Sequence, residues 1–337
     1  MMTATNRLIP ISVADPSQTG NARRQALALA AHMGFSEVRQ GQVGIVVTEA
    51  ARNIAAHAGK GEIVLAPWHL AECSGIDVFA LDAGQGIADI ARSLEDGYST
   101  AGTPGEGLGA ISRLAGSFHL YSVTGHGTAL FARFFRDEPG QASPECDLPF
   151  AAVSLPVEGE IVCGDAWSVS RAPDRSVYMM ADGLGHGPAA AEAAQEAVRV
   201  FQAAPHLPPE RILSDIHNAL VKTRGAAVSV AEILHKKAVL NYAGAGNIAA
   251  AISSGGKTKN LVSMNGTVGH TVAKFQQFSY PWENDPLFIM HSDGIATRWS
   301  VEQYPGLGTR HPALLAGVLF RDFLRKRDDA TVLVSRL

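Results

Sequence analysis

Over the first 136 residues, apolar positions recur at the spacing of helices and strands. The pattern predicts three helices, over residues 21–35, 43–58 and 108–115. Shorter apolar runs predict strands, and the last two of them close a hairpin: 62–65, 75–81, 118–123 and 128–134. Helices followed by strands, a helix and more strands indicate an α+β layer, not a repeated βαβ pattern.

A break in this pattern precedes a second half in which the predicted helices and strands follow a different order. Residues 137–149 contain three prolines and little periodic apolar character, so they are predicted to link a domain at 1–136 to a domain at 150–337. Beyond the break, helices are predicted over 188–203 and 208–224. Many strands accompany them, at 177–181, 228–234, 237–242, 247–252, 286–290 and 331–334. The second half is therefore expected to form a sheet-rich α/β sandwich.

Composition narrows the classes of function. Hydrophobic residues make up 46% of the chain, which favours a folded protein, and a net charge of −4 does not favour a general nucleic-acid binder. No apolar run approaches the ~18 residues of a membrane helix, and the start lacks a signal-peptide pattern. Three distant cysteines without a CxxC pair, Cys73, Cys146 and Cys163, are expected to be reduced thiols in a cytoplasmic protein.

The second predicted helix carries a pair of chemically useful side chains. Glu49 and Asn53 lie four residues apart and so share a helical face. A carboxylate there can orient or deprotonate a nucleophile, and an Asn amide oxygen is a hard ligand that suits Mg²⁺. By spacing alone, such a pair is more often two solvated side chains.

Two glycine-containing stretches change that interpretation. Asp82 directly follows a predicted strand and is followed by Gly84 and Gly86, where backbone can approach a ligand and a buried carboxylate can accept from an exocyclic amine. A second set of glycines leads into the third predicted helix, whose free N–H groups suit phosphates: Gly105, Gly107 and Gly109. The ordered triple of ExxxN, DxGxG and GxGxG favours a nucleotide site over isolated loops.

These motifs resemble the GHKL (Bergerat) ATP-binding fold shared by histidine kinases, gyrase-type ATPases and anti-sigma-factor kinases, over nearly all of residues 8–136. The stretches EAARNI, AGKG and LEDGYSTAG look most like the RsbT-like switch kinases. The resemblance implies Glu49 as catalytic base, Asn53 as ligand of the Mg²⁺ held with ATP, and Asp82 as the adenine contact. It also implies ATP-binding glycines, with the last three in a lid: Gly84, Gly86, Gly105, Gly107 and Gly109. No phospho-accepting His box precedes the domain, so the expected substrate is a Ser or Thr of a partner protein.

Turns that contain aspartate punctuate the second half. They hold Asp165, Asp182, Asp293 and the adjacent Asp328 and Asp329. Each is more often a turn former when taken singly, since Asp-Gly is common in turns. Together they offer hard oxygen ligands, and two Mg²⁺ or Mn²⁺ ions about 4 Å apart can activate a bridging water and clamp a phosphoryl group. Apolar strands beside three of these turns are expected to hold the aspartates at one end of a sheet.

Two nearby features have competing interpretations. His186 has no second His at i+3 or i+4 and no Cys nearby, so a zinc site is not favoured, and we expect a loop-shaping or phosphate-proximal role. The run AGAGN at 243–247 could be a nucleotide loop, but strand-like residues on both sides favour a hairpin bend.

The set GD, DGLGHG, YAGAGN, SDG and DDAT resembles, in this order, the SpoIIE-type branch of the PPM family of metal-dependent serine/threonine phosphatases, over residues 150–337. The RsbX-like phosphatases look most similar, although Cys163 stands where many members carry Gly. The resemblance implies an α-β-β-α sandwich whose two ions are held by these residues: Asp182 as the bridging ligand, the Gly183 carbonyl, Asp293 and Asp328, and Asp165 directly or through water. The DxxT spacing selects Asp328 over Asp329.

Together the resemblances imply a bifunctional bacterial partner-switching regulator that uses ATP, Mg²⁺ and Mn²⁺. It would phosphorylate a Ser or Thr of a STAS-domain partner, such as a stressosome or sigma-factor regulator, and remove phosphate from phosphoserine or phosphothreonine. No nucleic acid or membrane partner is expected. The alternative is an anti-sigma-type binding module that holds ATP as a structural ligand, with only the phosphatase active. A gyrase-type ATPase is not favoured because the phosphatase-like half takes the place of a transducer domain.

Overall fold

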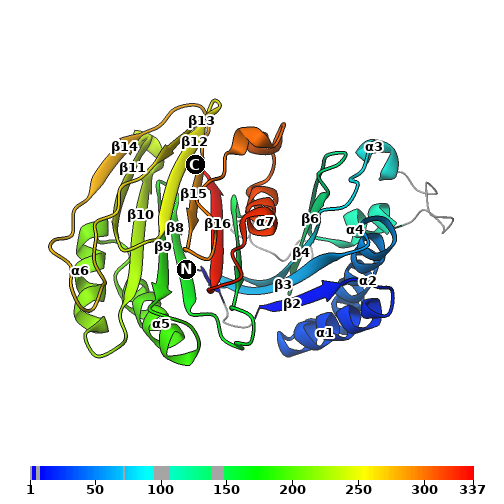
Figure 1. The fold of residues 1–337 in the computed structure, drawn as a ribbon, viewed down its shortest axis with the longest axis horizontal. Helices are drawn as coiled ribbons and strands as arrows, with labels where there is room; N and C mark the ends of the chain where they lie inside the picture. Colours follow the sequence, from blue (N-terminus) through cyan, green and yellow to red (C-terminus); the bar gives the residue numbers. More distant parts are fainter. Residues whose placement is uncertain (1, 5–7, 71–72, 95–106, 138–147) are drawn as a thin grey trace. The chain divides into compact units, whose positions relative to one another are not determined.

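The computed structural model describes residues 2–4, 8–70, 73–94, 107–137 and 148–337, and it divides into two compact units (Figure 1). The N-unit comprises Leu8–Leu148, and the C-unit comprises Met1–Arg7 with Pro149–Leu337. The sequence places the start of the chain in its first domain. In the structure, β1 (Met2–Ala4) instead pairs antiparallel with β8 (Asp165–Ala172) of the C-unit, with Met2 opposite Val169.

The N-unit is an antiparallel sheet with helices on one face. The strand order is β2 (Ile9–Val13), β3 (Gly61–Leu70), β4 (Cys73–Asp82), β6 (Thr128–Phe135) and β5 (Ser117–Ser122). The helices are α1 (Gln18–His32), α2 (Glu37–Asn53), the short α3 (Ile90–Ser93) and α4 (Gly107–Leu114). Their order in the chain confirms the expected α+β layer.

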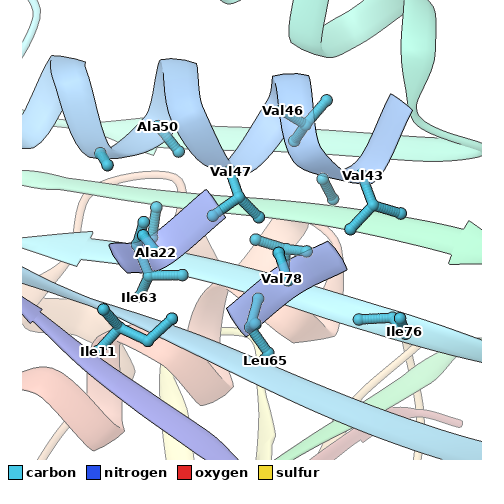
Figure 2. Close-up of a cluster of buried hydrophobic side chains, with 14 of the residues drawn as sticks. Ile11, Ala22, Val43, Val46, Val47, Ala50, Ile63, Leu65, Ile76 and Val78 are labelled. Carbon is cyan, nitrogen blue, oxygen red and sulfur yellow. The ribbon is translucent and has the colours of Figure 1, made fainter. Parts of the chain in front are cut away.

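The core of the N-unit lies between α2 and the sheet, as Figure 2 shows. One stripe of α2 at helical spacing faces the sheet, and it consists of Val43, Val47 and Ala50. It meets the alternating apolar residues of the strands beneath it, which are Ile11, Ile63, Leu65, Ile76 and Val78. Helix α1 packs beside α2 at Gly44, where an added Cβ would lie 3.0 Å from Leu27 Cδ2. Burial of these side chains is the main force that holds the helices on the sheet.

Both ends of α2 differ from the prediction of a helix over 43–58. The helix begins six residues earlier because Ser36 caps it, with the Ser36 hydroxyl accepting from the Arg39 backbone N–H at 3.3 Å. After Asn53 the chain continues in a π-helical turn, Ile54–Ala58, which Gly59 closes with a positive φ of 72°. Such turns occur often at functional sites.

The C-unit is a sandwich of two antiparallel sheets between helical layers (Figure 1). The first sheet runs in the order β14 (Phe278–Pro281), β11 (Val239–Ala245), β10 (Ala226–Leu234), β9 (Arg175–Gly183), β8 and β1. The second runs β13 (Lys257–Asn260), β12 (Ala249–Ser254), β15 (Leu287–His291), β16 (Ala330–Arg336) and β7 (Phe150–Leu155). Helices α5 (Pro188–Ala203) and α6 (Pro209–Leu220) cover the first sheet, and α7 (Pro312–Phe323) covers the second. The expected α-β-β-α architecture is confirmed.

Aromatic side chains fill the space between the two sheets. Tyr178 on β9 lies edge-on to Phe150 and Phe288, with ring centroids 5.8 Å and 5.6 Å away. Its hydroxyl bonds across to Ser335 on β16 at 2.7 Å. The sheets are therefore joined by apolar contact and by a buried hydrogen bond.

Two expectations about the chain are corrected here. The AGAGN run is not a hairpin bend, because β11 and β12 on either side of it belong to different sheets and Gly246 (φ 104°) turns the chain from one to the other. Of the cysteines expected to be reduced, Cys73 is disulfide-bonded, whereas Cys163 is a buried free thiol. Among the described residues, no helix is long and apolar enough to cross a membrane.

Candidate metal and nucleotide sites

Two predicted metal ligands of the C-unit face each other across a strand pair. Asp165 opens β8 and lies directly opposite Asp182 near the end of β9. Side chains of directly opposed residues project to the same face, with Cβ atoms about 4.5–5.5 Å apart. Gly183 follows, and its backbone N–H donates to the Gly164 carbonyl at 3.1 Å. The register of β8 and β9 therefore fixes the spacing of these two carboxylates.

Loops next to strands β15 and β16 of the second sheet bring further carboxylates to this end of the sandwich. Asp293 follows β15, and its Oδ2 accepts from Asn247 Nδ2 at 2.6 Å. Asp328 precedes β16 and accepts from the Asp329 backbone N–H. Asp329 is 2% exposed, and its two oxygens accept from the backbone N–H groups of Val157 and Gly164, each at 2.8 Å. Asp329 thus ties the loop before β8 in place, while Asp328 is less enclosed.

Mutual repulsion and burial raise the pKa values of these groups. For Asp182, burial comes first and the charges of Asp165, Asp293 and Asp328 follow, which raises the pKa to about 9. Burial likewise raises the pKa of Asp165, to about 7, against the opposing effect of its hydrogen bond from Ser292. Burial and the charge of Asp328 raise the pKa of Asp293. The buried carboxylates therefore lack a positive charge that would stabilise their ionised forms.

The donor set suits a divalent cation. Among the described residues, Asp165 Oδ1 is buried without a hydrogen-bond partner, so a carboxylate oxygen is available to a ligand. Across the described part of the chain, no three His, Cys, Asp or Glu side chains converge on one point as a metal cage. Mg²⁺ does not need one, because it binds through one or two carboxylates and keeps several waters.

Metal should stabilise the C-unit more at higher pH. Because the folded pKa values of Asp165 and Asp182 are raised, the metal-free native state holds protons that the unfolded chain releases, so its stability falls as pH rises from about 4 towards 9. A cation binds only the ionised carboxylates. We expect the rise in unfolding temperature on adding Mg²⁺ to be larger at about pH 8 than at about pH 6. Thermal unfolding with and without metal measures this. In Asp182→Asn, the rise in unfolding temperature caused by Mg²⁺ should differ less between about pH 6 and about pH 8.

Gly183 is required by the packing of α5 behind the aspartates. A Cβ at Gly183 would lie 2.1 Å from the carbonyl oxygen of Ala190 in the first turns of α5. We expect Gly183→Ala to destabilise the C-unit by about 1–3 kcal/mol, as overpacking does. Urea unfolding measures the loss. Gly41→Ala is the control, because a Cβ there meets nothing within 4 Å; equal stability of the two variants would contradict the packing argument.

His186 lies on the loop between Gly183 and α5 and contacts an acid, not a metal set. Its Nδ1 is 2.7 Å from Glu160 Oε1, and its ring is more than half exposed. Glu160 also lies against Gly187, where an added Cβ would come within 2.9 Å of the carboxylate. The Glu160–His186 pair therefore links the loop before β8 to the loop before α5, as a loop-shaping role requires.

The N-unit brings its predicted nucleotide residues together at the C-terminal end of α2. A Cβ placed on Gly107, the first residue of α4, would lie 3.4 Å from Glu49 Oε2 and 3.8 Å from Asn53 Oδ1. Asn53 Nδ2 is buried without a hydrogen-bond partner in the described structure. Glu49 Oε1 pairs with Arg52 Nη1 at 2.6 Å. The positive end of α4 thus faces a carboxylate and an amide, as a site for Mg²⁺ and phosphate would need.

The loop that follows Asp82 packs against the π-helical turn at the end of α2. Asp82 ends β4, and its Oδ1 accepts from the Gly84 backbone N–H at 2.8 Å. Gly84 lies against the π-helical turn, where an added Cβ would be 2.6 Å from Ala58 Cα, and Gly86 has a positive φ of 72°. Gly109 is buried within α4, so Gly107 and Gly109 belong to a helix and not to a loop. Gly105 lies outside the described residues.

Two polar contacts of the candidate metal site escaped the sequence analysis. Ser292 donates to Asp165 Oδ2 at 2.6 Å, and Asn247 donates to Asp293 as described above. Ser292 precedes Asp293 in the SDG motif, and Asn247 ends the AGAGN run. A polar side chain within each of these motifs was the sequence feature that could have identified them.

Comparison with known proteins agrees with this division. Residues 12–134 match the family described as histidine kinase-like ATPase domain, and residues 172–337 match stage II sporulation protein E (SpoIIE). The serine/threonine-protein kinase RsbT of Bacillus subtilis (strain 168) is 40% identical over 111 residues, which are 33% of this chain and 84% of RsbT.

Two solved structures each resemble a little over half of the chain. One, described as "The bacterial stressosome: a modular system that has been adapted to control secondary messenger signaling", is 26% identical with a TM-score of 0.52 and covers 56% of this chain and 98% of its own. A structure of RsbX in complex with magnesium is 21% identical with a TM-score of 0.51, and covers 56% of this chain and 94% of its own. At that identity the RsbX likeness shows the fold.

Proposed function

Because the chain belongs to the family of the serine/threonine-protein kinase RsbT and joins that domain to a SpoIIE-type protein serine/threonine phosphatase domain, we propose that it both phosphorylates and dephosphorylates its partner. A chain of this kind is a partner-switching regulator. The proposed partner is a STAS-domain protein of a stressosome or sigma-factor pathway, modified on Ser or Thr. The observation that carries the proposal is that both sets of polar groups are assembled, Glu49 and Asn53 beside Gly107, and Asp165 opposite Asp182.

In the phosphatase half, the role of the carboxylates is to bind and orient the metal ions. Mg²⁺ or Mn²⁺ bound at such a site lowers the pKa of water and polarises phosphoryl oxygens. The residues that would hold the ions are Asp182, the Gly183 carbonyl, Asp165, Asp293 and Asp328, with Asp182 as the central ligand because Asp165 lies directly opposite it. Asn247 occupies one oxygen of Asp293 and so leaves the other free to ligate.

In the kinase half, catalysis rests on positioning. Glu49 would accept the proton of the substrate hydroxyl, and Asn53 would hold the Mg²⁺ that accompanies ATP. The N-terminus of α4 offers backbone N–H groups to the phosphates, and Asp82 accepts from the adenine amine. The fixed contacts of Gly84 behind Asp82 support this assignment, since they hold the loop close to the turn after α2.

The proposal is tested with one chain in two steps. The purified protein is incubated with a candidate STAS-domain protein and labelled ATP, and incorporated phosphate is mapped. The nucleotide is then removed, Mn²⁺ is added, and released phosphate is measured. Label that enters and leaves the same or a related partner supports both activities; absence of release in the second step would refute the phosphatase half.

The alternative, a first domain that binds ATP without transferring phosphate, has one observation in its favour. Glu49 Oε1 is engaged by Arg52 at 2.6 Å, which competes with its use as a base. Nucleotide binding by calorimetry without any labelling of a bound partner would favour this binding module.

A further inference from the structure

A chain of buried hydroxyls crosses the C-unit and ends on Asp165. Ser292 Oγ donates to Asp165 Oδ2 at 2.6 Å and accepts from the Thr331 backbone N–H at 2.9 Å. Thr331 Oγ1 in turn donates to Ser154 Oγ at 2.9 Å. All four side chains are at most 4% exposed. The path joins β7, β15 and β16 of one sheet to β8 of the other.

The direction of these bonds fixes which oxygen of Asp165 can bind a cation. A serine hydroxyl has one proton, and because Ser292 Oγ already accepts from Thr331, that proton points to Asp165 Oδ2. Oδ2 is thereby occupied, while Oδ1 is buried and has no hydrogen-bond partner in the part of the chain that the structure describes.

We propose that Ser292 is a positioning residue for the metal site, which fixes Asp165 through its Oδ2 and so turns its Oδ1 toward the cation. The proposal rests on the phosphatase function proposed above and deepens it. Ser292 lies between β15 and Asp293, so the same segment supplies one carboxylate and orients another. The hydrogen bond from Ser292 to Asp165, a proposed metal ligand, thus also joins the two sheets of the sandwich.

Removing the hydroxyl should weaken metal binding itself. Partners that orient a metal ligand typically cost about 10–100-fold in affinity when lost. We expect Ser292→Ala to bind Mn²⁺ about 10–100-fold more weakly in calorimetry. Ser292→Cys keeps a donor at this position, though a weaker one on a larger atom, so its affinity should fall between wild type and Ser292→Ala. Thermal unfolding of the metal-free proteins checks that each variant folds.

Ser335→Ala is the matched control. Ser335 is fully buried and also bonds across the two sheets, to the Tyr178 hydroxyl at 2.7 Å, but it does not touch Asp165. A purely structural role predicts equal losses of stability and equal Mn²⁺ affinity in the two alanine variants. If Ser292→Ala binds Mn²⁺ as tightly as Ser335→Ala, the positioning role is overturned.

A double mutant separates this inference from the proposed function. If Ser292 acts through Asp165, Ser292→Ala should add no further loss of Mn²⁺ affinity in an Asp165→Asn background, whereas independent effects would add. A protein that shows this pattern but releases no phosphate from phosphoserine overturns the phosphatase function and leaves the positioning role standing. A wild-type protein that binds no Mn²⁺ overturns both.

Discussion

Asp182→Asn is expected to lower release of phosphate from phosphoserine by more than about 100-fold, since even residues that only orient a metal ligand cost about 10–100-fold. Asp182 lies opposite Asp165 and near Asp293 and Asp328, so its loss removes the negative charge at the centre of the cluster. Asn keeps the size of the side chain. Phosphate release from a phosphorylated partner in Mn²⁺ measures the effect.

The matched control is Asp174→Asn. Asp174 lies between β8 and β9, is exposed and pairs with Lys236 at 2.8 Å. Its loss should leave hydrolysis unchanged, as should the loss of Asp182 leave ATP-dependent labelling unchanged. Wild-type hydrolysis by Asp182→Asn would show that the metal ligands are wrongly assigned.

Glu49→Gln is expected to lower phosphoryl transfer to the partner by about 10²–10⁴-fold, the usual contribution of a general base. Glutamine keeps the shape of the side chain, so ATP should bind as before, because Asn53 and the N-terminus of α4 remain in place. Initial rates of partner labelling, with ATP affinity measured separately, test this.

Glu37→Gln serves as the control for Glu49→Gln. Glu37 lies in the first turn of α2, is exposed, and precedes Glu49 by about three helical turns. Labelling should proceed at the wild-type rate in that variant. Unchanged labelling in Glu49→Gln would instead favour the binding module.

Helices and strands that expose one face to solvent could be predicted from the sequence. Helix α5 spans residues 188–203 as predicted, because its buried alanines recur along one face and Pro188 begins it. Helix α7 escaped prediction because residues 312–320 are all buried, so no polar face marks its period. Strand β8 escaped it for the same reason, since Asp165 to Val169 are buried on both faces between the layers.

The candidate sites divide in a similar way. Aspartates in quoted motifs could be named, because Asp-Gly turns after apolar strands mark strand ends. The contacts that orient them could not, because they join distant segments: Ser292 reaches Asp165 across 127 residues and Asn247 reaches Asp293 across 46. Only the fold brings such partners together.

Strand β1 makes the N-unit an insertion within the C-unit. Residues 2–4 pair with β8, and the chain returns to the same unit at Pro149. A fragment that begins at residue 149 therefore leaves β8 without its antiparallel partner at Ser168 and Val169. Open strand edges recruit strands from other molecules. Cutting this protein between its two halves would thus produce a phosphatase fragment prone to self-association, whereas a fragment that carries the first strand by a short tether would be protected.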